Sequence, residues 1–179
     1  TITYASSSFI GGGRNNLILG DPTAAHEDFN IASGVDFAQD NFSAYDSAIL
    51  AGSENKIYTG HTSIIAGGSG NVISGSNKTG TWIGTEFRAD LPFLCTVAGG
   101  FENEIKNLSY GSFIGGGIQN SIKLDGTVVS IIQGVFSSAI VGGQQNKIHA
   151  DTNGTDFFSG WNFIGGGSFN TISGSSSSV

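Results

Sequence analysis

The sequence predicts an all-β protein, a β-solenoid of short stacked coils, and three observations lead to this fold class. Glycine supplies 29 of the 179 residues, which is about twice its usual share. Isoleucine far outnumbers leucine and methionine is absent, a composition that favours strands over helices. One short motif also recurs along the chain, so residues 1–179 are expected to form a single repeat domain.

The repeated motif has the pattern x-[IV]-x-[GA]-[GS]-x-x-N-x-I and occurs seven times, first at residues 9–18 and last at 163–172. Its asparagines are Asn16, Asn55, Asn71, Asn103, Asn120, Asn146 and Asn170. Their spacings of 39, 16, 32, 17, 26 and 24 residues indicate a coil of about 16 residues. The longer gaps are either two coils or one coil with an insertion. A degenerate copy at Trp82, Ile83 and Gly84 lies inside the gap of 32 residues. About ten or eleven coils are expected in all.

Each coil is predicted to contain two short strands joined by a glycine turn. The first strand is Ser8–Gly11 or its equivalent, the second is the Asn-x-Ile segment, and a further glycine such as Gly75 turns the chain back. In the second strand the isoleucine never varies, whereas the residue before it does, so the isoleucine points inward. The asparagine shares this parity. A buried ladder of asparagine side chains, bonded to one another and to the turn backbone, is therefore expected.

The inward positions of the first strand follow the same rule. They carry Ile or Val, preceded two residues earlier by a column of serines. Cys95 stands in this serine column, and because the two side chains are nearly the same size we expect a structural role for it.

The outward positions of the first strand exchange volume between neighbours. Phenylalanine is followed two residues later by glycine in all three cases, and alanine is followed by leucine or valine. Such an exchange indicates a face packed against a surface of fixed shape, most simply a second copy of the chain. The predicted homo-oligomer interface consists of Phe9, Ala48, Leu50, Ile64, Phe113, Ala139, Val141 and Phe163.

The motif S-x-I-G-G-G-x-x-N-x-I, which occurs at Ser63–Gly75 with Ala66 at its first glycine position, resembles the head repeats of trimeric autotransporter adhesins and the repeats of phage and algal-virus fibre proteins. It differs from them in its longer period, in Asn-x-Ile instead of Ser-x-Ala, and in its insertions. The resemblance implies a left-handed β-roll in a homotrimer, intertwined or side by side, with one strand of each coil facing the common axis. It also implies a fibre or adhesin module, extracellular, on a cell surface or on a virion, whose loops bind a surface glycan or a protein receptor.

Four insertions break the period, at about residues 19–47, 76–94, 123–137 and 149–161. Insertions on a solenoid become loops, often on the binding face, and aromatic rings beside carboxylates and amides suit sugar rings. The candidate ligand-binding residues are Trp82, Phe87, Arg88, Asp90, Asp151, Asn153, Asp156 and Trp161. Alternatively, these aromatic rings pack under their own loops or at the subunit interface. Residues 151–156 also space oxygen ligands for calcium, although a simple turn has the same composition; no other cofactor is expected.

Charge and motifs exclude several other functions. The net charge of −7 disfavours nucleic acid and anionic membrane surfaces as partners, and no apolar run is long enough to insert into a membrane. A single cysteine rules out an intrachain disulfide framework. No known catalytic motif occurs, so an enzyme is not expected. Two alternatives stay open. One is a purely structural extracellular filament subunit, for which end-to-end stacking of coils is expected. The other is a polysaccharide depolymerase using an acid pair such as Glu102 and Glu104 or Asp36 and Asp40.

Overall fold

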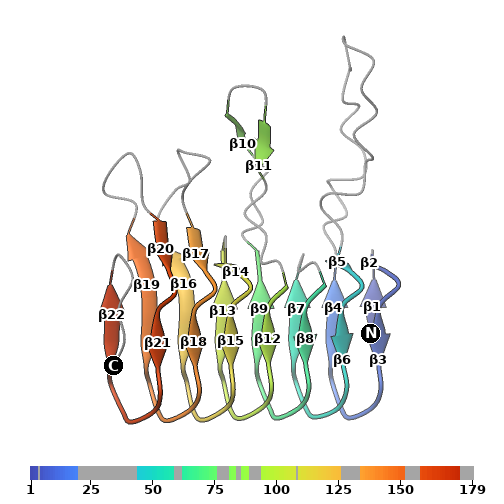
Figure 1. Ribbon diagram of the computed structural model, residues 1–179. Helices are drawn as coiled ribbons and strands as arrows, with labels where there is room; N and C mark the ends of the chain where they lie inside the picture. Colours follow the sequence, from blue (N-terminus) through green and yellow to red (C-terminus); the bar gives the residue numbers. More distant parts are fainter. Residues whose placement is uncertain are drawn as a thin grey trace.

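The protein is a parallel β-solenoid. The computed structural model describes residues 1–3, 5–19, 44–58, 62–75, 81–83, 86–88, 94–107, 109–125, 134–151 and 158–173, and every regular element in them is a β-strand. Two long parallel sheets run side by side along the stack of coils, and each coil contributes one strand to each sheet (Figure 1). This confirms the predicted fold class and its repeat architecture.

The strands of the two long sheets follow one another in chain order. The eight-stranded sheet consists of β1 (Ile2–Thr3), β4 (Leu17–Leu19), β7 (Lys56–Tyr58), β9 (Val72–Ser74), β13 (Glu104–Lys106), β16 (Ser121–Asp125), β19 (Lys147–Asp151) and β22 (Thr171–Ser173). The seven-stranded sheet consists of β3 (Phe9–Ile10), β6 (Ala48–Ile49), β8 (Ile64–Ile65), β12 (Thr96–Val97), β15 (Phe113–Ile114), β18 (Ala139–Ile140) and β21 (Phe163–Ile164).

Three smaller sheets accompany them. One is three-stranded and parallel, with β14 (Ser109–Tyr110), β17 (Gly134–Phe136) and β20 (Phe158–Gly160). A second pairs β2 (Ala5–Ser6) with β5 (Ala44–Tyr45), also in parallel. The third is an antiparallel pair of β10 (Thr81–Ile83) and β11 (Glu86–Arg88). Parts of the predicted insertions 123–137 and 149–161 therefore form strands.

The structure describes seven complete coils, so the expectation of ten or eleven is wrong. Strand β4 pairs directly with β7, and β9 pairs directly with β13, although their ladder asparagines are 39 and 32 residues apart. Each long gap is therefore one coil with an insertion. The supposed degenerate copy around Trp82 lies in the antiparallel β10–β11 pair and adds no rung to the solenoid.

The interior is filled by stacked columns of identical or similar side chains. The isoleucines of the second strand are completely buried from Ile18 to Ile148, and Ile172 in the last coil is 4% exposed. The first strand buries Ile or Val from Ile49 onward, together with its serine column. Cys95 is buried in that column and its Sγ donates to the Ser109 carbonyl oxygen at 3.0 Å. The predicted inward and outward parities are thus confirmed.

The asparagine ladder is buried and bonded in every coil. The Asn120 Nδ2 donates to the Gly116 carbonyl of its own coil at 2.9 Å and to the Gly143 carbonyl of the next coil at 3.0 Å. Its Oδ1 accepts the backbone N–H of Asn146 at 3.0 Å. Six of the seven asparagines are buried, and Asn170 in the last coil is half-buried.

The ladder also requires a glycine in each turn. Gly117 has φ 88°, a left-handed conformation that glycine adopts without steric cost. A Cβ at this position would collide with the Gly143 carbonyl oxygen and lie 2.7 Å from the Asn120 amide nitrogen. The glycine column and the asparagine column therefore depend on each other.

Replacing Asn120 by Leu should lower the free energy of unfolding by about 1–3 kcal/mol, because buried backbone groups of two coils lose their partner. Chemical denaturation measures the change. The control is Gln119→Leu at the neighbouring exposed position, which should change stability by less than about 0.5 kcal/mol. Equal losses in the two variants would contradict the structural role of the ladder.

Candidate functional site

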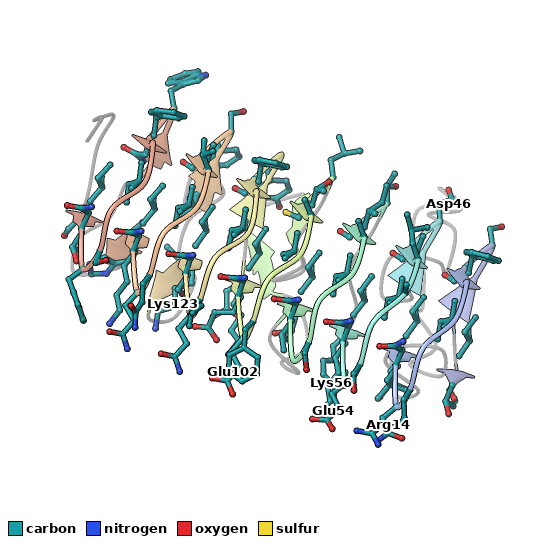
Figure 2. All side chains as sticks on the ribbon, turned by 90° about the horizontal axis from the view of Figure 1, so that it is seen from below. Arg14, Asp46, Glu54, Lys56, Glu102 and Lys123 are labelled. Atoms are coloured by element: carbon teal, nitrogen blue, oxygen red, sulfur yellow. The ribbon has the colours of Figure 1, made fainter. Side chains whose placement is uncertain are left out.

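The two long sheets present outer faces of opposite chemistry. The outward positions of the seven-stranded sheet carry no charged residue, whereas those of the eight-stranded sheet include Lys56, Glu104, Lys106, Lys123 and Lys147. In Figure 2, Lys56 and Lys123 point away from the solenoid on the same side as Arg14, Glu54 and Glu102. Within the described coils, a binding surface can lie only in these outward columns, since the inward columns are occupied by the core.

The uncharged face contains every residue predicted for an oligomer interface. Its large side chains are exposed, from 38% for Phe113 to 56% for Phe9, and Ala48 and Ala139 between them are half-buried. We call this surface the apolar face; it comprises Phe9, Ala48, Leu50, Ile64, Phe113, Ala139, Val141 and Phe163. The strip is interrupted by Thr96 in β12, but exposed apolar side chains that reach both ends of a sheet are unusual on a monomeric protein.

The exchange of volume on the apolar face has a cause within one chain. A Cβ at Gly115 would lie 3.2 Å from the Phe113 ring and would collide with the Val141 carbonyl oxygen of the next coil. Each phenylalanine ring thus lies beside the glycine two residues on. At Gly11 and Gly115 the backbone of the next coil also leaves no room for a Cβ. The expectation that the exchange requires a second chain is therefore not supported, although the resulting surface is apolar and exposed.

The predicted ligand-binding residues lie largely outside the described part of the structure. Trp82 and Phe87 are backbone partners in the β10–β11 pair, and Arg88 ends β11. Asp151 is the last residue of β19. The side chains of these four, and the whole of Asp90, Asn153 and Asp156, lie outside the described residues, as does the possible calcium segment. These assignments stay predictions.

Trp161 is the member of this set whose side chain is described. It precedes the buried Asn162, has φ 54° and is 68% exposed. It thus stands at the corner where the chain enters the first strand of the last coil, with most of its ring in contact with solvent.

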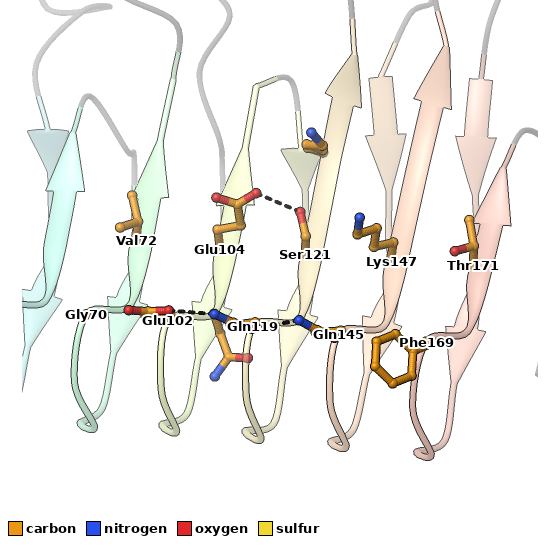
Figure 3. Close-up of a pocket in the computed structure, with 12 residues that line it drawn as sticks. Gly70, Val72, Glu102, Glu104, Gln119, Ser121, Gln145, Lys147, Phe169 and Thr171 are labelled. Carbon is orange, nitrogen blue, oxygen red and sulfur yellow. Dashed lines mark hydrogen bonds between the residues drawn. The ribbon is translucent and has the colours of Figure 1, made fainter.

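A shallow groove on the charged side was not expected from the sequence (Figure 3). Its volume is about 680 Å³, within the range of small-molecule sites. The Gln145 Nε2 donates to the Gln119 Oε1 at 2.9 Å, and the Gln119 Nε2 donates to the Glu102 Oε2 at 2.8 Å. The lining consists of Gly70, Val72, Glu102, Asn103, Glu104, Gln119, Ser121, Lys123, Gln145, Lys147, Phe169 and Thr171.

A second row in the groove centres on Glu104. Its carboxylate lies 2.6 Å from the Lys106 Nζ and accepts a 3.0 Å hydrogen bond from the Ser121 hydroxyl. Burial raises the pKa of Glu104, but Lys106, Ser121 and the charge of Lys123 together outweigh this effect and hold the pKa below its ordinary value. A carboxyl that stays ionised does not suit the general acid of a glycosidase.

The groove follows a column of residues in the left-handed conformation, which we call the left-handed column. Its φ values lie between 52° and 67°. Only Gly70 and Asn15 in this column are residue types that favour this conformation, and they are the one signal by which the sequence could have indicated it. The column consists of Asn15, Glu54, Gly70, Glu102, Gln119, Gln145 and Phe169.

The described residues contain neither a metal-binding group nor a membrane-spanning helix. No group of three or more histidine, cysteine, aspartate or glutamate side chains among them is placed to hold a metal ion. Nor does this part of the chain contain an apolar helix long enough to cross a bilayer.

Gly115→Ala should destabilise the protein by about 1–3 kcal/mol, because the new methyl group meets backbone of the adjacent coil. Thermal or chemical denaturation checks the prediction. Gly165→Ala is the matched control, since a Cβ there would meet only the Phe163 ring, at 3.3 Å, and should cost less than about 0.5 kcal/mol. The intrachain account fails if both variants are equally stable.

Glu104→Gln should lower stability at neutral pH by less than about 1 kcal/mol, the range of partly exposed ion pairs. Because the folded-state pKa is depressed, the contribution of Glu104 is present above its unfolded pKa, about 4.3, and is lost as the pH falls through its folded-state pKa. Denaturation curves of both proteins at several pH values should therefore converge in acid. A difference that persists unchanged below that range would contradict the assignment.

Comparisons with known proteins add no assignment to these surfaces. The chain matches no protein-family model, and neither the curated proteins nor the solved structures gave a significant match.

Proposed function

We propose that the protein is one subunit of a homotrimeric extracellular or virion rod, a fibre or adhesin module whose loops bind a surface glycan or a protein receptor. The observation that carries the proposal is the apolar face. Its exposed Phe, Leu, Ile and Val side chains occur from the first to the last coil of the seven-stranded sheet, interrupted at Thr96, without a charged neighbour in their columns.

The chemistry of the apolar face favours a second copy of the chain as its partner. Burying exposed apolar area is the main favourable term in stable association, and the centres of such interfaces are depleted in charge. The chain carries a net charge of −7, yet none of that charge stands in these columns. Three-fold packing of left-handed coils, side by side or intertwined, follows from the resemblance of the repeat to fibre and adhesin heads.

A trimer would also make ligand binding by the insertions more effective. Each loop would occur three times, so that weak single contacts could combine into useful avidity. The exposed Trp161 ring is suited to the apolar face of a sugar ring. The residues proposed for this role are those of the sequence prediction: Trp82, Phe87, Arg88, Asp90, Asp151, Asn153, Asp156 and Trp161.

Light scattering should give the protein a mass of three times 18.4 kDa. Ile64→Glu should reduce this mass, because a carboxylate would be buried without a partner in the proposed interface. The matched control is Val72→Glu, which places the same charge on the opposite face of the same coil and should leave the mass unchanged. A monomeric wild-type protein, or equal effects of both variants, would reject the trimer.

A further inference from the structure

We propose that the groove along the left-handed column binds an uncharged glycan chain, with Phe169 as its aromatic platform and Gln119, Gln145 and Glu102 as its hydrogen-bonding row. This inference deepens the glycan-binding part of the proposed function and does not depend on the trimer. It places a binding site on the regular coils, in addition to the insertions.

The left-handed column carries residue types that are costly in its backbone conformation. Left-handed backbone costs roughly 1–2 kcal/mol for a residue other than glycine, with asparagine and aspartate better tolerated. The fold accepts Gly70 and Asn15 in this column, yet its last three coils carry Gln119, Gln145 and Phe169 there, with φ of 54°, 55° and 61°. Other residue types also adopt this conformation before the first strand of the coils, for example Thr62 and Leu94, so what distinguishes this column is its aromatic and amide side chains.

The Phe169 ring is exposed at the groove. It is 70% exposed, so little packing within the chain offsets its backbone cost. Figure 3 shows the ring at one end of the groove, next in line after Gln145. An exposed ring beside amide groups is the arrangement that accommodates the C–H face of a pyranose while its hydroxyl rim is hydrogen-bonded.

Gln145, Gln119 and Glu102 form a hydrogen-bonded row along the groove. The two amides donate in one direction, from Gln145 to Gln119 and from Gln119 to Glu102. Each amide nitrogen carries a second N–H, and the Glu102 carboxylate has further lone pairs. Neighbouring rungs are about 4.8 Å apart. The row therefore offers regularly repeated donors and acceptors to hydroxyl groups, which both donate and accept.

Charge identifies the class of glycan. The groove lining contains two carboxylates, Glu102 and Glu104, and two ammonium groups, Lys123 and Lys147, so its formal charge is zero. A polyanion would need a clear excess of positive charge; with Lys106, which lies outside the lining and pairs with Glu104, the local excess is one charge. An uncharged polysaccharide fits this balance, whereas a uronic-acid polymer or a nucleic acid does not.

The test measures binding of the whole protein to immobilised neutral glucan, mannan and galactan chains, with a polyuronate for comparison. The wild type should bind at least one neutral chain in preference to the polyuronate. Phe169→Gly and Gln145→Ala should each weaken that binding by at least about tenfold. The control Phe101→Ala removes another exposed ring, 46% exposed and outside the groove lining, and should change binding by less than about twofold.

Folding is checked on the same variants. Because glycine is favoured at the φ of 61° that Phe169 adopts, Phe169→Gly should have a denaturation midpoint equal to or above that of the wild type. Loss of binding without loss of stability would support a ligand-binding ring. Binding equal to wild type in Phe169→Gly would overturn the proposal, as would a wild type that binds no neutral chain or prefers the polyuronate.

Two further outcomes separate the groove from the proposed function. If the double variant Trp82→Ala, Trp161→Ala loses glycan binding while Phe169→Gly keeps it, the loop sites stand and the groove is rejected. If light scattering shows a monomer while Phe169→Gly loses glycan binding, the rod is rejected and the groove stands. A change in assembly mass in Phe169→Gly would instead make this face a protein interface and overturn the glycan proposal.

Discussion

The amide side chain of the ladder asparagine is the interaction on which the rest of the solenoid depends. Each amide joins a carbonyl of its own turn to a glycine carbonyl of the next coil and accepts the backbone N–H of the next asparagine. It thereby excludes a Cβ from the glycine column and sets the turn between the two sheets. The bond from the Asn55 backbone N–H to the Asn16 Oδ1 is 3.1 Å across 39 residues, the same length as the bond from Asn71 to Asn55 across 16. Insertions are tolerated because the ladder resumes at each asparagine, whatever the chain does in between.

Because the inward columns hold the coils together, the outward positions can vary, and their variation is not random. The seven-stranded sheet carries only uncharged residues outside, Thr96 and otherwise apolar side chains, whereas the eight-stranded sheet places Lys56, Glu104 and Lys147 there. A solenoid that needed only solubility would have charges on both faces. The asymmetry is the physical basis on which we propose assembly at one face and ligand binding at the other.

The inward columns could be predicted from the sequence, because burial allows few alternatives. The invariant isoleucines, the asparagines, and the serine column that accommodates Cys95 all follow from period-two alternation. The coil count could not be predicted, since a spacing of 32 residues fits either two coils or one coil with an insertion, and only the pairing of β9 with β13 decides between them. Nor could the role of Gly115 beside Phe113, because the contact depends on how the ring lies on the sheet. The groove escaped prediction because its defining feature is a backbone conformation, and five of the seven residues that adopt it are types that rarely do so.

The same coil carries the two most exposed aromatic rings of the described chain. Trp161 and Phe169 have left-handed φ values and are 68% and 70% exposed, and they stand at the two corners of the segment 161–173. Between them, Asn162, Ile164 and Ile172 are buried. A coil held this firmly from within can carry an unfavourable backbone conformation and an exposed ring at each corner without unfolding, because the core columns supply its stability independently. The two corners of this coil therefore present the most exposed aromatic surface of the described chain to contacts from outside.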